Sequence, residues 1–124
     1  MGKRIKLNIE GRELFAELND STTSKIFAIK LPMTIKMERW GGEYYGDCDV
    51  SVNKENGAKT EMEIGEIAIW PDGCALCIFF GPTPASVDEK PRAISPVNPI
   101  GKIEGDVSFL NELPQSIEVR VEEA

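Results

Sequence analysis

Two cysteines with a two-residue spacing, Cys74 and Cys77, are the first candidates for redox or metal chemistry. They lie in an apolar run that predicts a β-strand, where residues three apart point to opposite faces. The two sulfurs would diverge, and the sequence has no second pair of this spacing and no histidine to complete a four-ligand site. We therefore interpret both as small buried residues, and we expect no metal and no cofactor.

Histidine is absent from all 124 residues. Its absence excludes Ser-His and Cys-His nucleophiles and histidine acid-base chemistry near neutral pH. Neighbouring acids, such as Glu61 with Glu63 and Asp47 with Asp49, alternate as on a solvated strand face and lack the spacing of a calcium loop. The ionisable residues thus give little support to catalysis or metal binding.

An aromatic segment at residues 40–46 is a better candidate for a functional surface. It combines Trp40, Tyr44 and Tyr45 with three glycines. One interpretation is a turn whose rings cover the end of a barrel. The other is a flexible loop whose rings border a ligand groove, since loops on rigid scaffolds often carry binding residues.

Phe79 and Phe80 end the longest apolar run, residues 74–80. Adjacent residues of a strand point to opposite faces, so we favour one ring in the core and the other beside a pocket. The run is apolar on both faces, which predicts a strand covered on both sides.

The elements that must position these residues are mostly strands. Apolar and polar residues alternate on both sides of the turn at Glu10-Gly11, which predicts a hairpin. A helix is predicted over Thr22 to Lys30, with Asp20 or Ser21 as its N-cap. Later alternations predict further strands, including one over residues 48–52.

Two segments are predicted to form a loop and a helix, and not strands. The proline-rich stretch 81–99 predicts a long ordered loop, and residues 106–113 predict a second short helix capped by Asp106 and ended by Pro114. The total of about eight short strands and two short helices favours a closed barrel or a sandwich in a single domain, residues 1–124.

Charge and hydropathy limit the partners. The net charge of −7, without a basic stripe, argues against nucleic-acid binding. An apolar run of seven residues cannot span a bilayer, and no apolar stretch follows the charged first residues as it would in a signal peptide. Three cysteines, an odd number, fit a reducing compartment, so we expect a cytoplasmic protein. From its charge and hydropathy we expect no nucleic-acid or membrane partner.

Four motifs follow one another along the chain: Gly41-Gly42 through Tyr45-Gly46, Gly65 to Trp70, Phe79 to Pro84 and Val97 to Ile103. In this order they resemble motifs of the cyclophilins, which are prolyl cis–trans isomerases. The resemblance is nearest to the small prokaryotic cyclophilin-like proteins and spans most of residues 3–122. It implies a mainly β fold, a closed eight-stranded barrel with two short helices capping its ends.

One segment departs from the cyclophilin pattern. Cyclophilins carry Phe-His-Arg and then a glutamine before the glycine-glycine loop, whereas residues 32–40 contain neither histidine nor glutamine. The family's arginine stabilises the twisted prolyl amide, and Arg39 and Arg92 are the candidates to replace it.

Three functions therefore stay open. The leading hypothesis is a barrel that binds a peptide, such as one containing proline, or a small apolar ligand in an aromatic groove. The second is a weak prolyl isomerase, and the third is a non-catalytic interaction subunit. The expected ligand-binding residues are Trp40, Tyr44, Tyr45, Phe79 and Phe80.

Overall fold

The computed structural model describes residues 3–124, which form nine β-strands, one α-helix and two 3-10 helices. The helices are α1 (Thr22–Ile29), η1 (Pro71–Gly73) and η2 (Ser108–Glu112). The strands are β1 (Arg4–Ile9), β2 (Arg12–Leu18), β3 (Met33–Trp40), β4 (Glu43–Asp47), β5 (Lys59–Glu61), β6 (Glu66–Trp70), β7 (Ala75–Phe79), β8 (Arg92–Ile103) and β9 (Ser116–Glu123).

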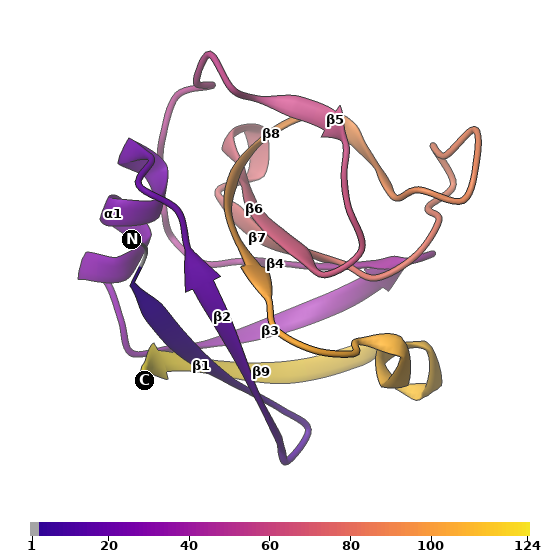
Figure 1. Cartoon of the computed structure of the whole chain (residues 1–124), viewed down its shortest axis with the longest axis horizontal. Helices are drawn as coiled ribbons and strands as arrows, with labels where there is room; N and C mark the ends of the chain where they lie inside the picture. Colours follow the sequence, from indigo (N-terminus) through magenta and orange to yellow (C-terminus); the bar gives the residue numbers. More distant parts are fainter. Residues whose placement is uncertain (1–2) are drawn as a thin grey trace.

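Eight of the strands form a closed ring, which confirms the predicted mainly β, cyclophilin-like fold. The order is β2-β1-β9-β3-β4-β7-β6-β8, and antiparallel pairing of β2 with β8 closes it. The short strand β5 pairs only with β8 and lies outside the ring. Figure 1 shows α1 on one side of the ring and η2 on the other.

The first hairpin and helix have the predicted structure. β1 and β2 pair in antiparallel register through a turn in which Glu10 and Gly11 both have positive φ, 51° and 86°. The side chain of Ser21 accepts a hydrogen bond from the backbone N–H of Ser24 and so caps α1.

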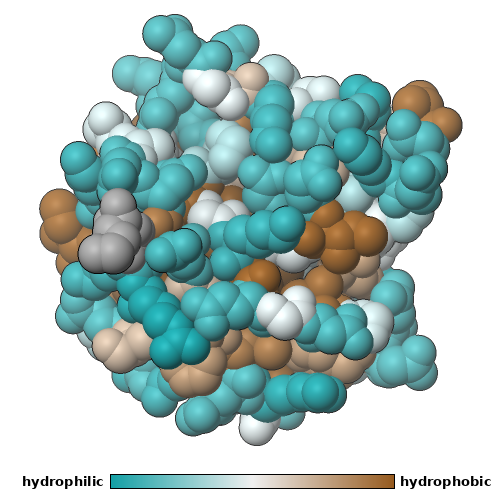
Figure 2. Space-filling model, viewed as in Figure 1, coloured by the Kyte–Doolittle hydropathy of each residue, from teal (hydrophilic) through white to brown (hydrophobic). Residues whose placement is uncertain are grey.

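The ring encloses the main hydrophobic core. Alternate residues of each strand point inward, as Ile5, Leu7 and Ile9 of β1 do, and these three side chains are fully buried. Phe27 of α1 closes one side of this core. Hydrophilic side chains cover most of the surface seen in Figure 2, and hydrophobic ones show between them and at two places on the rim.

A second hydrophobic cluster lies on the outer face of the ring. All five residues of β7 are buried, as predicted for a strand covered on both sides. Leu76 and Ile78 belong to the inner core, whereas Cys77 and Phe79 belong to the outer cluster. The other members of the outer cluster are Met62, Ala68, Ala93 and Val97, with Trp70 packed against them.

The aromatic segment 40–46 is a hairpin and not a flexible loop. Gly41 and Gly42 form the turn, and the residues after them form β4, which pairs with both β3 and β7. The strand predicted over residues 48–52 is absent, because Asp49 has a φ of 58° and the chain leaves the extended conformation there.

Two further predictions are corrected. β8 begins at Arg92, inside the predicted loop 81–99, and contains Pro96 and Pro99. Proline is tolerated there because the pairing of β8 is irregular with β6 beside Pro99 and with β5 between Arg92 and Val97, where Pro96 lies. The predicted second helix is only a 3-10 turn, η2, although the carboxylate of Asp106 accepts a hydrogen bond from the backbone N–H of Ser108, the first residue of this turn.

No helix within residues 3–124 has the length and apolar character that crossing a bilayer requires.

Candidate functional site

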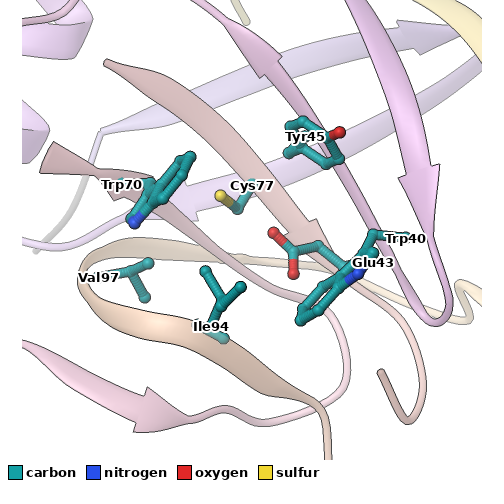
Figure 3. Close-up of a pocket in the computed structure, with 8 residues that line it drawn as sticks. Trp40, Glu43, Tyr45, Trp70, Cys77, Ile94 and Val97 are labelled. Carbon is teal, nitrogen blue, oxygen red and sulfur yellow. The ribbon is translucent and has the colours of Figure 1, made fainter. Parts of the chain in front are cut away.

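A pocket of about 220 Å³ opens on the outer face of the ring, beside the second hydrophobic cluster. Its lining is mostly aromatic and aliphatic, with one carboxyl group and one thiol, and Figure 3 shows these side chains converging on the cavity. They come from β3, β4, β6, β7 and β8. The lining residues are Trp40, Glu43, Tyr45, Trp70, Cys77, Ala93, Ile94 and Val97.

Strand alternation in β4 directs two of these side chains outward. Tyr44 points into the ring core and is fully buried, so Glu43 and Tyr45 on either side of it face the pocket. Glu43 lies opposite Trp40 on β3 and opposite Phe79 on β7. The carboxyl group is thus carried by the first residue of β4, next to the Gly41-Gly42 turn, and strand pairing on both sides holds it there.

Glu43 is the unusual residue of the pocket. Its exposed fraction is 6%, and among the described residues no side chain or backbone group gives its buried Oε1 a hydrogen bond. Burial raises the pKa of Glu43 to about 7, and a hydrogen bond with the side chain of Cys77 opposes that rise. Near neutral pH the pocket therefore contains a carboxyl group that is partly ionised and incompletely paired.

Close backbone packing fixes the hairpin that carries Trp40 and Glu43. The N–H of Gly42 donates to the carbonyl of Pro82 at 2.8 Å, and the carbonyl of Gly42 accepts from Phe80 at 2.8 Å and Gly81 at 3.1 Å. A Cβ atom on Gly42 would lie 2.1 Å from the carbonyl carbon of Gly81. Only glycine allows this approach, which attaches the hairpin to the chain leaving β7.

The indole of Trp70 is also fixed in place. Its Nε1–H donates a hydrogen bond to Oγ of Ser95 at 2.7 Å, linking the end of β6 to β8. The ring is also in close contact with Gly73 of η1, where a Cβ atom would lie 2.5 Å from it. One aromatic wall of the pocket is therefore already oriented.

Of the two cysteines predicted to be buried in a strand, only Cys77 is; Cys74 is half-buried and lies outside the strand. All three are free thiols. Cys74 ends η1 with a φ of 50°, outside the strand, and Cys77 faces the pocket from β7. Burial, followed by the neighbouring Glu43, raises the pKa of Cys77 well above its usual value, so its thiol stays protonated and is a poor nucleophile.

Two of the five expected ligand-binding residues, Trp40 and Tyr45, line the pocket. Tyr44 and Phe80 stack in the ring core with their centroids 5.5 Å apart, and Phe79 is fully buried in the outer cluster. Phe79 and Phe80 thus face opposite sides of the sheet, but neither lines the cavity. The five residues expected to line one groove are thus divided between the pocket, the ring core and the outer cluster.

Neither candidate arginine lines the pocket. The Nε–H of Arg39 donates to the carbonyl of Gly41 at 2.9 Å, and its guanidinium carbon lies 5.2 Å from the centre of the Phe80 ring. Arg92 lies near Oγ1 of Thr60 at 3.3 Å and a carboxyl oxygen of Glu61 at 3.5 Å. Both guanidinium groups are thus engaged with other parts of the chain.

Sequence reasoning missed Glu43, Trp70, Cys77 and the β8 residues of the pocket. One signal was available for Glu43, because an acid between a glycine turn and two tyrosines is unusual in a buried strand. For β8 there was none, since its prolines predict a loop. Within residues 3–124, no three side chains of the kinds that bind metals lie close enough to form a site.

Comparisons with known proteins agree with this fold. No curated protein matches the sequence. A hypothetical protein from the archaeon Archaeoglobus fulgidus, known from a solution structure, is 35% identical; the match covers 99% of this chain and 95% of that protein, with a TM-score of 0.82. The model of the family described as cyclophilin-like matches residues 3–122. The chain therefore belongs to the cyclophilin-like family.

Proposed function

We propose that this protein binds a small, largely apolar molecule, or a single ring of a peptide such as a proline side chain, in the pocket on the outer face of the ring. The observation that carries the proposal is a cavity of about 220 Å³ whose walls are two indoles, a phenol and aliphatic side chains. Concave apolar sites with few polar groups are typical of small-ligand binding.

The volume of the pocket and the fixed positions of two of its walls support this function. A cavity of roughly 150 Å³ is enough to admit benzene, so about 220 Å³ suits a single saturated or aromatic ring. The hydrogen bond of Trp70 and the packing of Gly42 hold two walls in place before a ligand arrives. Little conformational entropy would then be lost on binding, which favours affinity.

The proposal contains no isomerisation step. A prolyl amide bound in this pocket would meet neither Arg39 nor Arg92, because neither lines the cavity. Without a cation beside the carbonyl, the pocket offers a place for a ring but no clear electrostatic aid to its rotation.

The two tryptophans of the sequence make the test direct, because both line the pocket. Their indole N–H signals in an NMR titration therefore report on this site alone. We expect cyclohexanol, N-acetylprolinamide or both to shift these signals and the amide signals of neighbouring residues on β4, β7 and β8. Shifts confined to other regions, or no shift with either compound at millimolar concentration, would contradict the proposal.

A matched pair of exposed isoleucines provides the control. Ile94 is 68% exposed and lines the pocket, whereas Ile29, at the end of α1, is 82% exposed and does not. Both can be replaced by alanine with little effect on the core. We expect Ile94→Ala to weaken binding by about threefold to tenfold and Ile29→Ala to leave it unchanged.

A further inference from the structure

The position of Glu43 indicates which polar group a ligand should carry, if the proposed function is correct. In Figure 3 its carboxyl group lies among the labelled rings of the pocket, with the indoles of Trp40 and Trp70 on either side. Its Oε1 has no hydrogen-bond partner among the described residues. A buried carboxylate oxygen without a partner is costly, so a ligand that supplied a donor would gain free energy there.

The surrounding rings favour a positively charged donor. Trp40, Tyr45 and Trp70 come from three different strands and line the same cavity. The faces of aromatic rings attract cations, indole most strongly, and this attraction increases when the cation is removed from water. The described lining residues include no lysine or arginine that could neutralise Glu43.

The net charge of the whole chain also favours a cationic ligand. The net charge is −7, which raises the local concentration of small cations and repels anions. An anionic ligand would in addition meet the Glu43 carboxylate directly, at high cost in an apolar pocket.

We propose that the natural ligand is a small organic cation, an alkylated amine whose ammonium N–H donates to the carboxylate of Glu43 while its carbon groups contact Trp40, Tyr45 and Trp70. The protonated nitrogen supplies the missing donor, and the alkyl groups occupy the aliphatic side of the pocket formed by Ile94 and Val97. A quaternary ammonium ion lacks the N–H and should bind less well than a tertiary one.

Binding to the protonated form of Glu43, in place of its ionised form, is the competing outcome. A neutral Glu43 carboxyl group would itself donate a hydrogen bond, for example to the carbonyl of an uncharged ligand, and such binding would weaken as the pH rises. The other titratable side chains facing Glu43 are Cys77 of β7 and Tyr45 of β4; the pocket residues of β3, β6 and β8 do not titrate. The direction of the pH dependence therefore reports on Glu43.

The experiment compares N-methylpiperidine, which is protonated below pH 9, with cyclohexanol, a neutral ring of the same number of heavy atoms. Affinities are measured through the tryptophan indole signals at pH 6 and pH 8. At pH 8 we expect the cation to bind on the order of tenfold more tightly than the alcohol. Its affinity should rise by up to about tenfold from pH 6 to pH 8, as Glu43 loses its proton, while that of cyclohexanol should rise little or fall.

Two charge-neutralising variants complete the design. Glu43→Gln should remove the preference for the cation and its pH dependence while cyclohexanol still binds, which also shows that the pocket is folded. Glu89→Gln changes the net charge equally at a residue outside the pocket lining and should leave both affinities unchanged within about twofold.

The outcomes separate the two proposals. If cyclohexanol binds but the cation binds no more tightly, or binds more weakly at pH 8 than at pH 6, the cation proposal is wrong and the proposed pocket function stands. An unchanged preference in Glu43→Gln would also overturn it. If neither probe shifts the indole signals, both proposals fail.

Discussion

The indole Nε1–H of Trp70 donates a hydrogen bond to the hydroxyl oxygen of Ser95, and the two atoms are 2.7 Å apart. This bond joins the end of β6 to β8 at the edge of the pocket. It orients one aromatic wall of the pocket, which packs against the outer cluster and not the ring core, so its effect on binding and its effect on stability can be separated.

We therefore expect Ser95→Ala to weaken ligand binding without a large loss of stability. Freed of its partner, the Trp70 ring can adopt other orientations, and the affinity for cyclohexanol should fall by about fivefold. The free energy of unfolding in urea should fall by no more than about 1 kcal/mol. Ser116→Ala is the control, because it removes an exposed hydrogen bond to Glu38, which is outside the pocket lining. An unchanged affinity in Ser95→Ala would show that Trp70 is held by packing alone.

Glu43 should make stability depend on pH in an unusual direction. Its pKa is raised to about 7 in the folded chain from an ordinary value of 4.5. The folded state therefore holds this proton more tightly, so the contribution of Glu43 to stability is greatest below pH 4.5 and falls as the pH rises through 7. The loss should approach roughly 3 kcal/mol.

Urea unfolding of the wild type and of Glu43→Gln from pH 4.5 to pH 8 measures this effect. The amide does not titrate, so the stability of the wild type relative to the variant should fall steadily over this range. A difference that stays constant with pH would mean that Glu43 is solvated and titrates as an ordinary acid.

Asn98 should be a strong determinant of stability. Its side chain is 1% exposed and makes three hydrogen bonds, donating to Thr23 Oγ1 at 3.0 Å and the Asn53 carbonyl at 2.9 Å, and accepting from the N–H of Glu55 at 3.0 Å. Asn98→Ala leaves these partners unsatisfied in a buried region and should cost about 3 kcal/mol of unfolding free energy.

The exposed Asn111, which donates one hydrogen bond to the carbonyl of Ser108, is the matched control for this measurement. Asn111→Ala should cost less than about 1 kcal/mol. Equal losses in the two variants would indicate that water replaces the bonds of Asn98 after the substitution.

Two glycine-to-alanine substitutions should have very different effects. A Cβ atom at Gly42 meets the backbone of Gly81 at 2.1 Å, so Gly42→Ala must separate the hairpin from the end of β7. We expect a loss of at least about 2 kcal/mol in thermal or urea unfolding, together with weaker ligand binding, because Trp40 and Glu43 lie on either side of this turn. At Gly57 a Cβ atom meets nothing within 4 Å, and Gly57→Ala should change stability by less than about 1 kcal/mol.

Much of the fold could be predicted from the pattern of residue types along short segments of the sequence. The alternation in β1, β2 and β9 and the helix capped by Ser21 were predictable, because each depends on periodicity and turn chemistry within a few residues. β8 was not predictable, since its prolines favour a loop by themselves. They are accommodated because the pairing of β8 is irregular beside each of them, with β6 next to Pro99 and with β5 in the stretch that contains Pro96.

The sequence by itself determined that this protein has a mainly β fold of the cyclophilin-like kind and that its chemistry does not depend on histidine, and it made the aromatic segment 40–46 a candidate functional surface. Only the tertiary structure decided which rings are core and which are pocket, and that Glu43 lies between Trp40 and Trp70. The physical reason is that the sheet pairs β4 with β7 and β6 with β8, strands that are far apart in the sequence. Burial and pairing of a side chain depend on these neighbours, which periodicity along one strand cannot specify.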